Sequence, residues 1–359
     1  MNIMQIFPGK VWGGAEQYVL DLSSALENAG HRVVYFARDS AAVRRRMDGV
    51  RQVRYLKFSG MADLRSIRVI AMAMAEEEID LVHIHETRFV PMVSEAVRRS
   101  GRRVRVVLTR HIARGSRVSF WNRRYFLRLH RIIFVSDLAR RLWTEANPWM
   151  AAASCRVVHN SIPPLADGMD CEPLRQHYGI PEDVPLLVFT GRVRRSKGCA
   201  VLVEALGRLR YLPFHMVFIG TCKPADYHRE LGALAVRCGI GDRVSFYGFT
   251  DRARQLIRGA DIGVAPSIVR EACPLSPMEF MQAGKCVIAT DNGAQPEYIV
   301  SGKDGLLVPP GDVDALTSAL ASVLEDKALR LRLGRQARVH FEADMNYSRF
   351  VQSVLKVYR

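Results

Sequence analysis

Short apolar runs alternate with segments of helical periodicity along most of the chain, and this alternation limits the fold more than any other feature. A strand, a helix and a second strand in this order form a parallel sheet covered by helices. Residues 16–29 show the helical spacing in the first such unit, and Gly30 is placed to end that helix. In the first half we predict strands at residues 3–7, 32–37, 53–58, 81–85, 105–108, 131–135 and 156–159.

The pattern breaks between residues 162 and 184, where Pro163-Pro164 and Asp167-Gly168 fall, and then begins again. The length of 359 residues is sufficient for two domains. We therefore expect an α/β protein with two Rossmann-like, doubly wound domains. The second set of strands is predicted at residues 186–190, 215–219, 244–247, 262–265, 287–290 and 305–308.

The expected domain boundaries follow from this break. Residues 1–165 form the N-terminal domain, residues 166–340 the C-terminal domain, and residues 341–359 a last helix that packs back toward the N-terminal domain. Ligands of open parallel sheets bind at the carboxyl ends of the strands. The functional site is therefore expected in a cleft between the two domains.

The whole chain has a formal net charge of +16, and its basic residues are concentrated in the first half. Residues 1–168 hold 27 Lys and Arg against 15 Asp and Glu, so this part carries +12 and the rest +4. Such a surface suits a phosphate-bearing acceptor, an anionic membrane or a nucleic acid, although a basic surface without a partner stays an alternative. Residues 44–57 and 114–131 could contact a membrane, and the second stretch also fits an ordinary packed helix.

The seven cysteines are scattered and form no C-x-x-C pair, which argues against a disulfide framework and against a zinc site. No run approaches the roughly 20 apolar residues of a membrane-spanning helix. Residues 1–7 fit a first strand better than a signal peptide. We therefore expect a cytoplasmic protein that could contact the inner face of the membrane at its periphery.

Two glutamates, Glu271 and Glu279, stand eight positions apart around an expected helix start. Glu271 follows the strand at 262–265, and Pro277 suits the first turn of a helix that Gly284 ends. Free N–H groups at a helix start suit a phosphate, and carboxylates accept hydrogen bonds from sugar hydroxyls. On spacing alone, a surface glutamate plus an ordinary helix glutamate is an equal alternative.

This segment resembles the E-x7-E pattern of the retaining glycosyltransferases of the GT-B fold, family four, also called glycosyl transferases group 1. The resemblance implies that Glu271 binds hydroxyls of a donor sugar and takes part in catalysis, and that Glu279 binds the ribose of a nucleotide-sugar. The matching surroundings are residues 13–16, 260–267, 278–284, 287–290 and 305–312, with Gly293 and Glu297.

The chain departs from the family at Cys273-Pro274, where relatives often have Phe-Gly. Pro274 has no N–H, so one contact to phosphate or sugar is lost at this position. We expect the backbone at Leu275 and Ser276 to serve instead, with Cys273 beside the donor.

A basic loop at residues 191–198 is similar to the family's G-R-x4-K-G segment. Arginine and lysine at the carboxyl end of a parallel strand suit a diphosphate, Arg192 as a planar fork and Lys197 as a point charge. The resemblance implies that Arg192 and Lys197 neutralise the leaving diphosphate. Without the resemblance, a solvated basic loop is the better interpretation.

Four residues of the N-terminal half are further candidates. Gly13 and Gly14 let the backbone approach a ligand closely before a helix start, and in relatives this loop lies against the donor phosphates and the acceptor. His111 is similar to a histidine that many relatives place beside the reacting sugar, so we predict that it orients the donor and stabilises charge. Arg110 is expected to meet an anionic acceptor. A plain turn and a structural histidine stay as alternatives.

No metal is predicted. His83 and His85 lie on one strand and are interpreted as pointing to opposite faces, so that they would not share an ion. Asp312-Val313-Asp314 is a D-x-D sequence that we interpret as a helix N-cap. With Arg192, Lys197 and a helix start to balance the diphosphate charge, neither a metal nor another cofactor is required.

We therefore predict a retaining, metal-independent glycosyltransferase that moves a sugar from a nucleotide-sugar donor to an anionic acceptor of the cell envelope, such as a lipid-linked one. A nucleotide-sugar epimerase or hydrolase on the same fold is the first alternative, and a phosphorylase is a weaker one. A nucleic-acid-binding protein is the alternative of another class. The chain has neither a basic-aromatic platform for single strands nor a zinc-finger pattern, so no nucleic-acid partner is expected.

Overall fold

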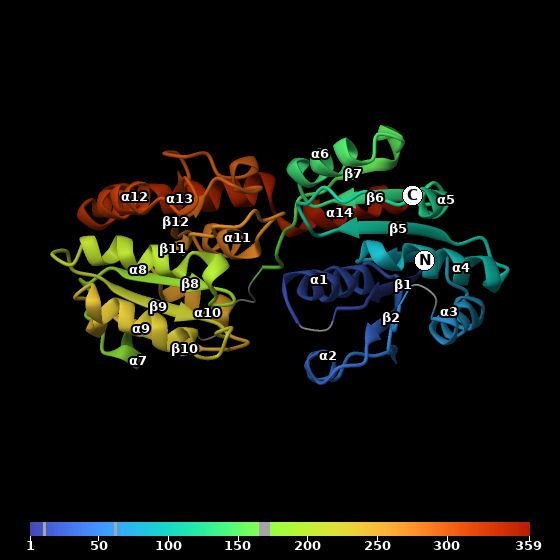
Figure 1. Cartoon of the computed structure of the whole chain (residues 1–359), viewed down its shortest axis with the longest axis horizontal. Helices are drawn as coiled ribbons and strands as arrows, with labels where there is room; N and C mark the ends of the chain where they lie inside the picture. The colour runs from blue at the N-terminus through green and yellow to red at the C-terminus, as the bar shows by residue number, and fades with distance from the viewer. Residues whose placement is uncertain (10–11, 61–62, 165–172) are drawn as a thin grey trace. The chain divides into compact units, whose positions relative to one another are not determined.

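The computed structural model describes residues 1–9, 12–60, 63–164 and 173–359. The chain divides into two compact units, Met1–Asn160 together with Tyr347–Arg359, and Ser161–Asn346. Each unit is a parallel β-sheet with helices packed on it (Figure 1). The prediction of two Rossmann-like domains is therefore confirmed. Asp167-Gly168 and Cys171 lie outside the described residues.

The sheet of the N-terminal unit has the order β3-β2-β1-β4-β5-β6-β7, and its strand pairs are parallel. The order reverses between β1 and β4, which is where parallel sheets of this kind bind ligands. The strands are β1 (Asn2–Phe7), β2 (Arg32–Arg38), β3 (Val53–Leu56), β4 (Leu81–Ile84), β5 (Arg105–Arg110), β6 (Arg131–Phe134) and β7 (Cys155–Val157).

Two hydrophobic clusters cover the two faces of this sheet, because successive residues of a strand point to opposite sides. Along β1, Met4 and Ile6 belong to one cluster, whereas Ile3 and Phe7 belong to the other. The first cluster includes residues of α3 (Leu64–Glu76) and α4 (Val90–Ser100), and the second includes residues of α1 (Gly14–Asn28) and α14 (Tyr347–Tyr358). The α1/α14 face of the sheet therefore carries residues 3, 5 and 7 of β1.

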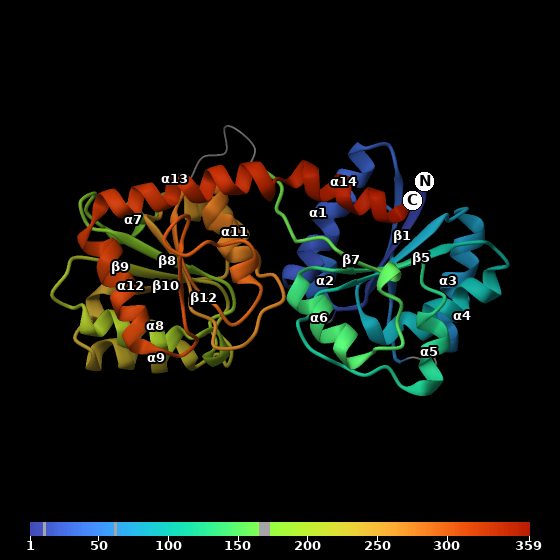
Figure 2. The same cartoon turned by 90° about the horizontal axis from the view of Figure 1, so that it is seen from above.

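The last helix, α14, closes the N-terminal unit (Figure 2). It packs against α1 and β6, and the Tyr347 hydroxyl donates a hydrogen bond to the carbonyl of Asp21. At its far end, Arg105 donates to the carbonyl of Arg359 at 3.1 Å. Both chain termini therefore belong to the same unit.

The sheet of the C-terminal unit has the order β10-β9-β8-β11-β12-β13, again with parallel pairs and a reversal between β8 and β11. Three of its strands have the predicted bounds. The strands are β8 (Leu186–Thr190), β9 (His215–Ile219), β10 (Val244–Gly248), β11 (Ile262–Ala265), β12 (Cys286–Thr290) and β13 (Leu306–Val308).

The helices of this unit include α8 (Cys199–Arg208), α9 (Tyr227–Arg237), α11 (Leu275–Gln282), α12 (Val313–Glu325) and α13 (Lys327–Asp344). This unit also holds the short helices α7 (Leu174–Tyr178) and α10 (Ala253–Leu256), and the N-terminal unit also holds α2 (Ala41–Arg46), α5 (Phe120–Phe126) and α6 (Asp137–Ala146). Among the helices in the described ranges, none is long and apolar enough to cross a membrane.

Candidate active site

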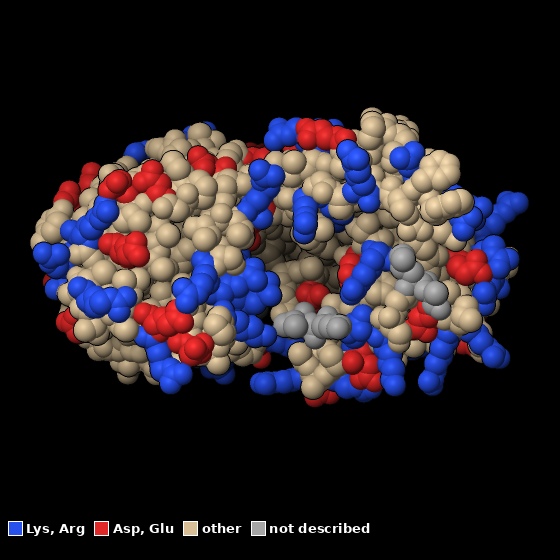
Figure 3. Space-filling view, in the orientation of Figure 1, with Lys and Arg blue, Asp and Glu red and all other residues tan. Residues whose placement is uncertain are grey.

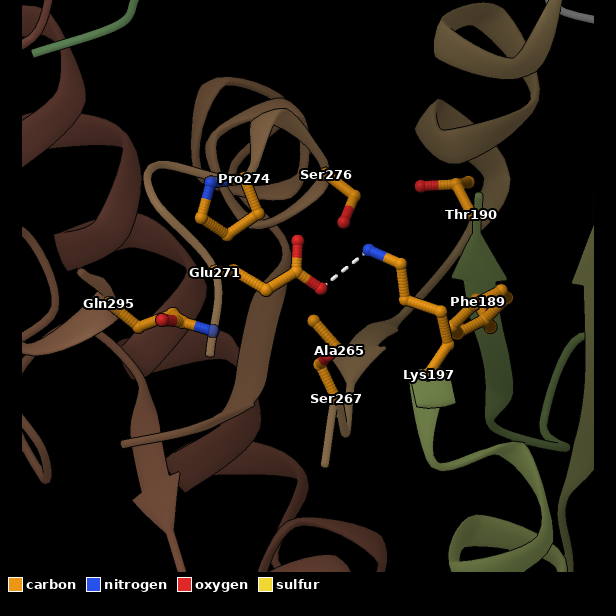
Figure 4. A pocket seen from close by; sticks show the side chains of 9 residues that line it. All are labelled: Phe189, Thr190, Lys197, Ala265, Ser267, Glu271, Pro274, Ser276 and Gln295. Atoms are coloured by element: carbon orange, nitrogen blue, oxygen red, sulfur yellow. Dashed lines mark hydrogen bonds and ion pairs between the residues drawn. The ribbon is translucent and has the colours of Figure 1, made fainter. Parts of the chain in front are cut away.

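A pocket opens at the carboxyl ends of β8 and β11, where the order of the second sheet reverses (Figure 4). Its volume is about 250 Å³, including space open to solvent. The walls come from the end of β8, the loop before α8, the loop after β11 and the start of α11. The lining residues are Phe189, Thr190, Lys197, Ala265, Ser267, Glu271, Pro274, Ser276 and Gln295.

An ion pair joins two of the predicted residues inside this pocket. Lys197 Nζ lies 2.5 Å from Glu271 Oε1, and the two side chains are 21% and 17% exposed (Figure 4). The loop that carries Lys197 is held against β11, because a Cβ on Gly198 would lie 1.8 Å from the carbonyl oxygen of Pro266. Gly198 also has φ +71°, which favours glycine. Sequence residues 74 positions apart are thus brought into one charged site.

The start of α11 forms another wall of the pocket. The helix begins at Leu275 with Pro274 as its N-cap, and no described side chain caps it. The first N–H groups of a helix have no partner within the helix, so those of Leu275 and Ser276 suit an anion. The helix is held close to β11, because a Cβ on Gly263 would lie 2.1 Å from the Phe280 ring.

The other predicted residues of the C-terminal unit do not line this pocket. Arg192 lies exposed beyond the end of β8, and Glu279 is half-buried on α11. Cys273 is 6% exposed, which makes its side chain part of the protein interior. The pocket therefore unites Lys197, Glu271 and Ser276 from the predicted set.

Gln295 is a pocket residue that the sequence analysis missed. Its side chain is buried at 1% exposure, and neither its amide oxygen nor its amide nitrogen has a hydrogen-bond partner among the described residues. The Thr190 hydroxyl in the same pocket is buried and equally unpaired within the described chain. Buried polar groups are almost always paired in proteins, so these atoms indicate a ligand. The signal lay beside Gly293 and Glu297, which the family pattern had already marked.

Gly293 braces the loop that carries Glu271. A Cβ on Gly293 would lie 2.6 Å from the carbonyl oxygen of Glu271 and 2.3 Å from Gln295 Oε1. The next amide, that of Ala294, donates to the Glu271 carbonyl at 3.0 Å. Only a residue without a side chain fits here, so the position of Glu271 depends on this glycine.

In the N-terminal unit, His111 directly follows β5 and is half-buried. Its Nε2 lies 3.1 Å from His85 Nδ1, and the Tyr18 ring packs against it edge-on with 4.8 Å between centroids. Burial lowers the pKa of His111 to about 4. The imidazole is therefore neutral at physiological pH and cannot act as a fixed cation.

The interpretation of His83 and His85 was wrong. Residues two positions apart on a strand share a face, and the two ring centroids lie 4.1 Å apart. His83 contacts the hydroxyls of Thr109 and Tyr358, and His85 contacts Gln5 and His111. All four ring nitrogens are engaged in these hydrogen bonds, which leaves no lone pair free for a metal.

Arg110 is also corrected, because the structure buries it at 1% exposure. Its guanidinium lies 4.2 Å from the centroid of the Trp143 ring and donates to the Ser116 hydroxyl at 3.0 Å and to the carbonyl of Arg114. Burial lowers its pKa to about 10. The reason is the strand alternation, which turns Arg110 away from the α1/α14 face. It supports the loop after β5 and is not presented to an acceptor.

Gly13 and Gly14 stand at the start of α1, where Gly13 is the extended N-cap. An acidic side chain lies beside them. A Cβ on Gly9 would lie 1.8 Å from Glu16 Oε1, and one on Gly13 would lie 3.4 Å from Glu16 Oε2. The role of this loop toward the donor stays a prediction.

The D-x-D sequence behaves as predicted. The Asp312 carboxylate accepts a hydrogen bond from the amide of Ala315 at 2.9 Å and caps α12. Asp314 forms an ion pair with Arg208. Helix capping explains the first aspartate.

Comparison with known proteins identifies the family. The model for glycosyl transferases group 1 matches residues 170–340, and the model for glycosyltransferase family 4 matches residues 12–164. The chain belongs to the group 1 glycosyltransferases. Its resemblance to that family, first inferred from the glutamate pair, is confirmed.

Among the relatives of this glycosyltransferase is the phosphatidyl-myo-inositol mannosyltransferase of Mycolicibacterium smegmatis, 29% identical over 91% of this chain and 86% of that protein. The lipopolysaccharide core biosynthesis mannosyltransferase LpcC of Rhizobium leguminosarum is 33% identical, over 47% of this chain and 49% of LpcC. The crystal structure of Anabaena HepE in complex with UDP is 20% identical, with a TM-score of 0.85 over 99% of both chains. This last likeness supports the GT-B fold.

Proposed function

We propose that this glycosyltransferase moves a sugar, with retention of configuration and without a metal, from a nucleotide-sugar to an anionic acceptor of the cell envelope. The observation that carries the proposal is the Lys197–Glu271 pair beside the uncapped start of α11 in one pocket. The solved structure of HepE with UDP-glucose supports a nucleotide-sugar as the donor. Retention rests on the family resemblance, and the cleft between the two domains stays a prediction.

The leaving diphosphate is the anion that this pocket suits. The ammonium of Lys197 and the N–H groups of Leu275 and Ser276 would face its oxygens, and Arg192 would add a second cation from the end of β8. Fixed donors of this kind stabilise the charge that develops in the transition state. Because these groups balance the charge, we propose that the reaction needs no metal or other cofactor.

The sugar would be held by polar groups that the pocket leaves available. Glu271 accepts hydrogen bonds from hydroxyls, and the amide of Gln295 with the hydroxyl of Thr190 can both donate and accept them. Glu279 is proposed to bind the ribose, as the family resemblance implies. Positioning of the two substrates then supplies a large part of the rate enhancement.

The acceptor is proposed to be anionic and to bind the basic N-terminal unit. Lys and Arg side chains are spread over the face of this unit that Figure 3 shows. On α5, Phe120 and Trp121 are 72% and 76% exposed beside Arg123 and Arg124, whereas Phe126 is buried. Exposed aromatics among arginines suit an anionic lipid surface. We propose a cytoplasmic protein that contacts the membrane at its periphery through α5.

Binding and product analysis test this function together. A panel of nucleoside diphosphates and nucleotide-sugars should raise the melting temperature of the wild type for one nucleotide series, by mass action. Glu271→Gln should weaken the shift by the nucleotide-sugar more than that by the nucleoside diphosphate, because it removes a sugar contact. Glu342→Gln, which breaks an exposed ion pair with Arg338 on α13, is the matched control.

Product analysis with donor alone separates the alternatives. A transferase should leave the donor largely intact until an acceptor is added. Rapid conversion of the nucleotide-sugar without an acceptor would assign a hydrolase or an epimerase instead. No shift with any nucleotide would contradict the donor assignment.

A further inference from the structure

Gln5 is a polar residue in the middle of β1 with no exposed surface. It pairs with His83 in the sheet register and points to the α1/α14 face, as Ile3 and Phe7 do. Burying an amide is unfavourable unless it is hydrogen-bonded. The contacts of Gln5 therefore explain why this position is not apolar like its neighbours.

A line of hydrogen bonds runs from Gln5 to His111. Gln5 Oε1 lies 2.8 Å from His85 Nε2, and His85 Nδ1 lies 3.1 Å from His111 Nε2. An amide oxygen can only accept, so His85 carries its proton on Nε2. Neutral His85 then accepts at Nδ1, and His111 must donate from Nε2.

Burial keeps both rings neutral, since it lowers the pKa of His85 well below its ordinary value and that of His111 to about 4. A neutral imidazole has one protonated and one bare nitrogen. Within the described chain, no group forms a hydrogen bond with Nδ1 of His111. This nitrogen therefore presents a lone pair.

The direction of the whole line depends on the orientation of the Gln5 amide, because a reversed amide would reverse every donor and acceptor. Tyr358, the last residue of α14, stands on the other side of this amide. Among the described residues, no group meets full hydrogen-bond geometry with the amide nitrogen of Gln5. Burial raises the pKa of the Tyr358 hydroxyl, and the interaction of Gln5 with this hydroxyl acts in the opposite direction and lowers that pKa. A lowering is what a donor directed at the phenol oxygen produces, so the amide nitrogen faces Tyr358.

Tyr358 is anchored in turn by His83. The Tyr358 hydroxyl lies 2.7 Å from His83 Nδ1, and His83 Nε2 lies 2.6 Å from the Thr109 hydroxyl. With the amide nitrogen directed at Tyr358, the phenol donates to His83, and His83 donates to Thr109. The donors and acceptors of Gln5, Tyr358, His83 and Thr109 are thus consistent with one another.

We propose that Gln5 and Tyr358 are positioning residues that hold His111 as the Nε2–H tautomer, so that its Nδ1 accepts a hydrogen bond from a substrate hydroxyl. The tautomer follows from the hydrogen bonds of Gln5 and His85, the interaction of Gln5 with Tyr358 and the neutral state of the rings. Its use in catalysis rests on the proposed function. The last helix of the chain is thereby connected to a residue of the reaction site.

The direct test is long-range 1H–15N NMR of the substrate-free protein with 15N-labelled histidine, in which His111→Asn assigns the signal. We expect His111 to carry its proton on Nε2 and to show a bare Nδ1. Observation of the Nδ1–H tautomer, or of an equal mixture, would overturn the proposal. This result does not depend on any activity, so a failure of the proposed function would be seen separately.

Variants test the positioning role. Gln5→Leu and Tyr358→Phe should each produce a tautomer mixture at His111 and lower kcat roughly tenfold, with the KM for the donor little changed. Tyr347→Phe is the matched control, since it removes a hydroxyl from the same helix, one that donates to the carbonyl of Asp21. A single unchanged tautomer in both folded variants would contradict the role of Gln5 and Tyr358.

Discussion

The pocket of the C-terminal unit and the histidine cluster of the N-terminal unit differ in charge and in how far their polar groups are hydrogen-bonded. The pocket holds a cation, a carboxylate and two buried polar groups that are unpaired in the described chain. The cluster of His83, His85 and His111 is neutral, and hydrogen bonds connect its rings to their surroundings. Unpaired polar groups are suited to binding a charged ligand, whereas paired neutral groups keep a fixed orientation. This difference supports the proposals that the pocket binds the donor and that the histidine cluster orients His111.

The largest effect is expected from the cation of the pocket. Lys197→Ala should lower kcat/KM by about 10²–10³-fold, because it removes a fixed positive charge from the departing diphosphate. Steady-state kinetics with the donor varied would measure it. Arg338→Ala, which removes an exposed cation from α13, should leave the rate unchanged. If Lys197→Ala changed the rate no more than this control, the pocket would not be the site of diphosphate departure.

A smaller change is expected at the unpaired amide. Gln295→Leu should lower the transfer rate roughly tenfold, while the free energy of unfolding stays the same or rises by up to about 1 kcal/mol, since a buried unpaired amide is unfavourable. Urea unfolding and kinetics on the same sample would show the two effects moving in opposite directions. A clear loss of stability would indicate that Gln295 is a structural residue and would weaken the contrast with the histidine cluster.

Gly293, which packs against the backbone of Glu271, is expected to affect stability, and a second glycine serves as the control. Gly293→Ala places a Cβ against the Glu271 backbone and should lower the free energy of unfolding by about 1–3 kcal/mol, since overpacking displaces the loop. Gly232→Ala lies on α9 with no atom within 4 Å of the added Cβ, and should stabilise the protein slightly. Equal unfolding curves for the two variants would mean that the Glu271 loop moves to make room for the Cβ without a loss of stability.

A graded dependence on pH is the remaining expected effect, and it belongs to the N-terminal unit. Burial lowers the pKa of His83 to about 3 and that of His111 to about 4, from an unfolded value of 6.5. Between these values the unfolded chain binds more protons, so the free energy of unfolding falls as the pH drops from 6.5 toward 4, and it is constant above 6.5 as far as these groups are concerned.

Fluorescence can report this dependence for one unit alone. The four tryptophans of the chain all precede residue 150, so their signal follows the N-terminal unit. Urea unfolding at a series of pH values should show the midpoint of this signal falling with acid. His83→Gln should reduce the slope. A midpoint that does not move between pH 6.5 and 5 would contradict the burial of neutral histidines.

The sequence determined the periodic features of this protein. Buried strands and amphipathic helices are encoded locally, so the two sheets, the strand bounds to within two residues and the start of α11 were predictable. The glutamate pair and the Arg192–Lys197 loop followed from the family pattern, and the N-cap at Asp312 followed from local chemistry. The strand alternation also contained the shared face of His83 and His85, although the first interpretation missed it.

Only the tertiary structure decided which side chains meet. Strand order and the packing of loops against each other produce the contact of Lys197 with Glu271 and the burial of Arg110 under Trp143. They also leave the buried amide of Gln295 without a hydrogen-bond partner among the described residues. The connection of Tyr358 to Gln5 joins the two ends of the chain. Such contacts form between residues far apart in sequence, so local periodicity carries no information about them. Their geometry exists only when the sheets, helices and loops have been assembled.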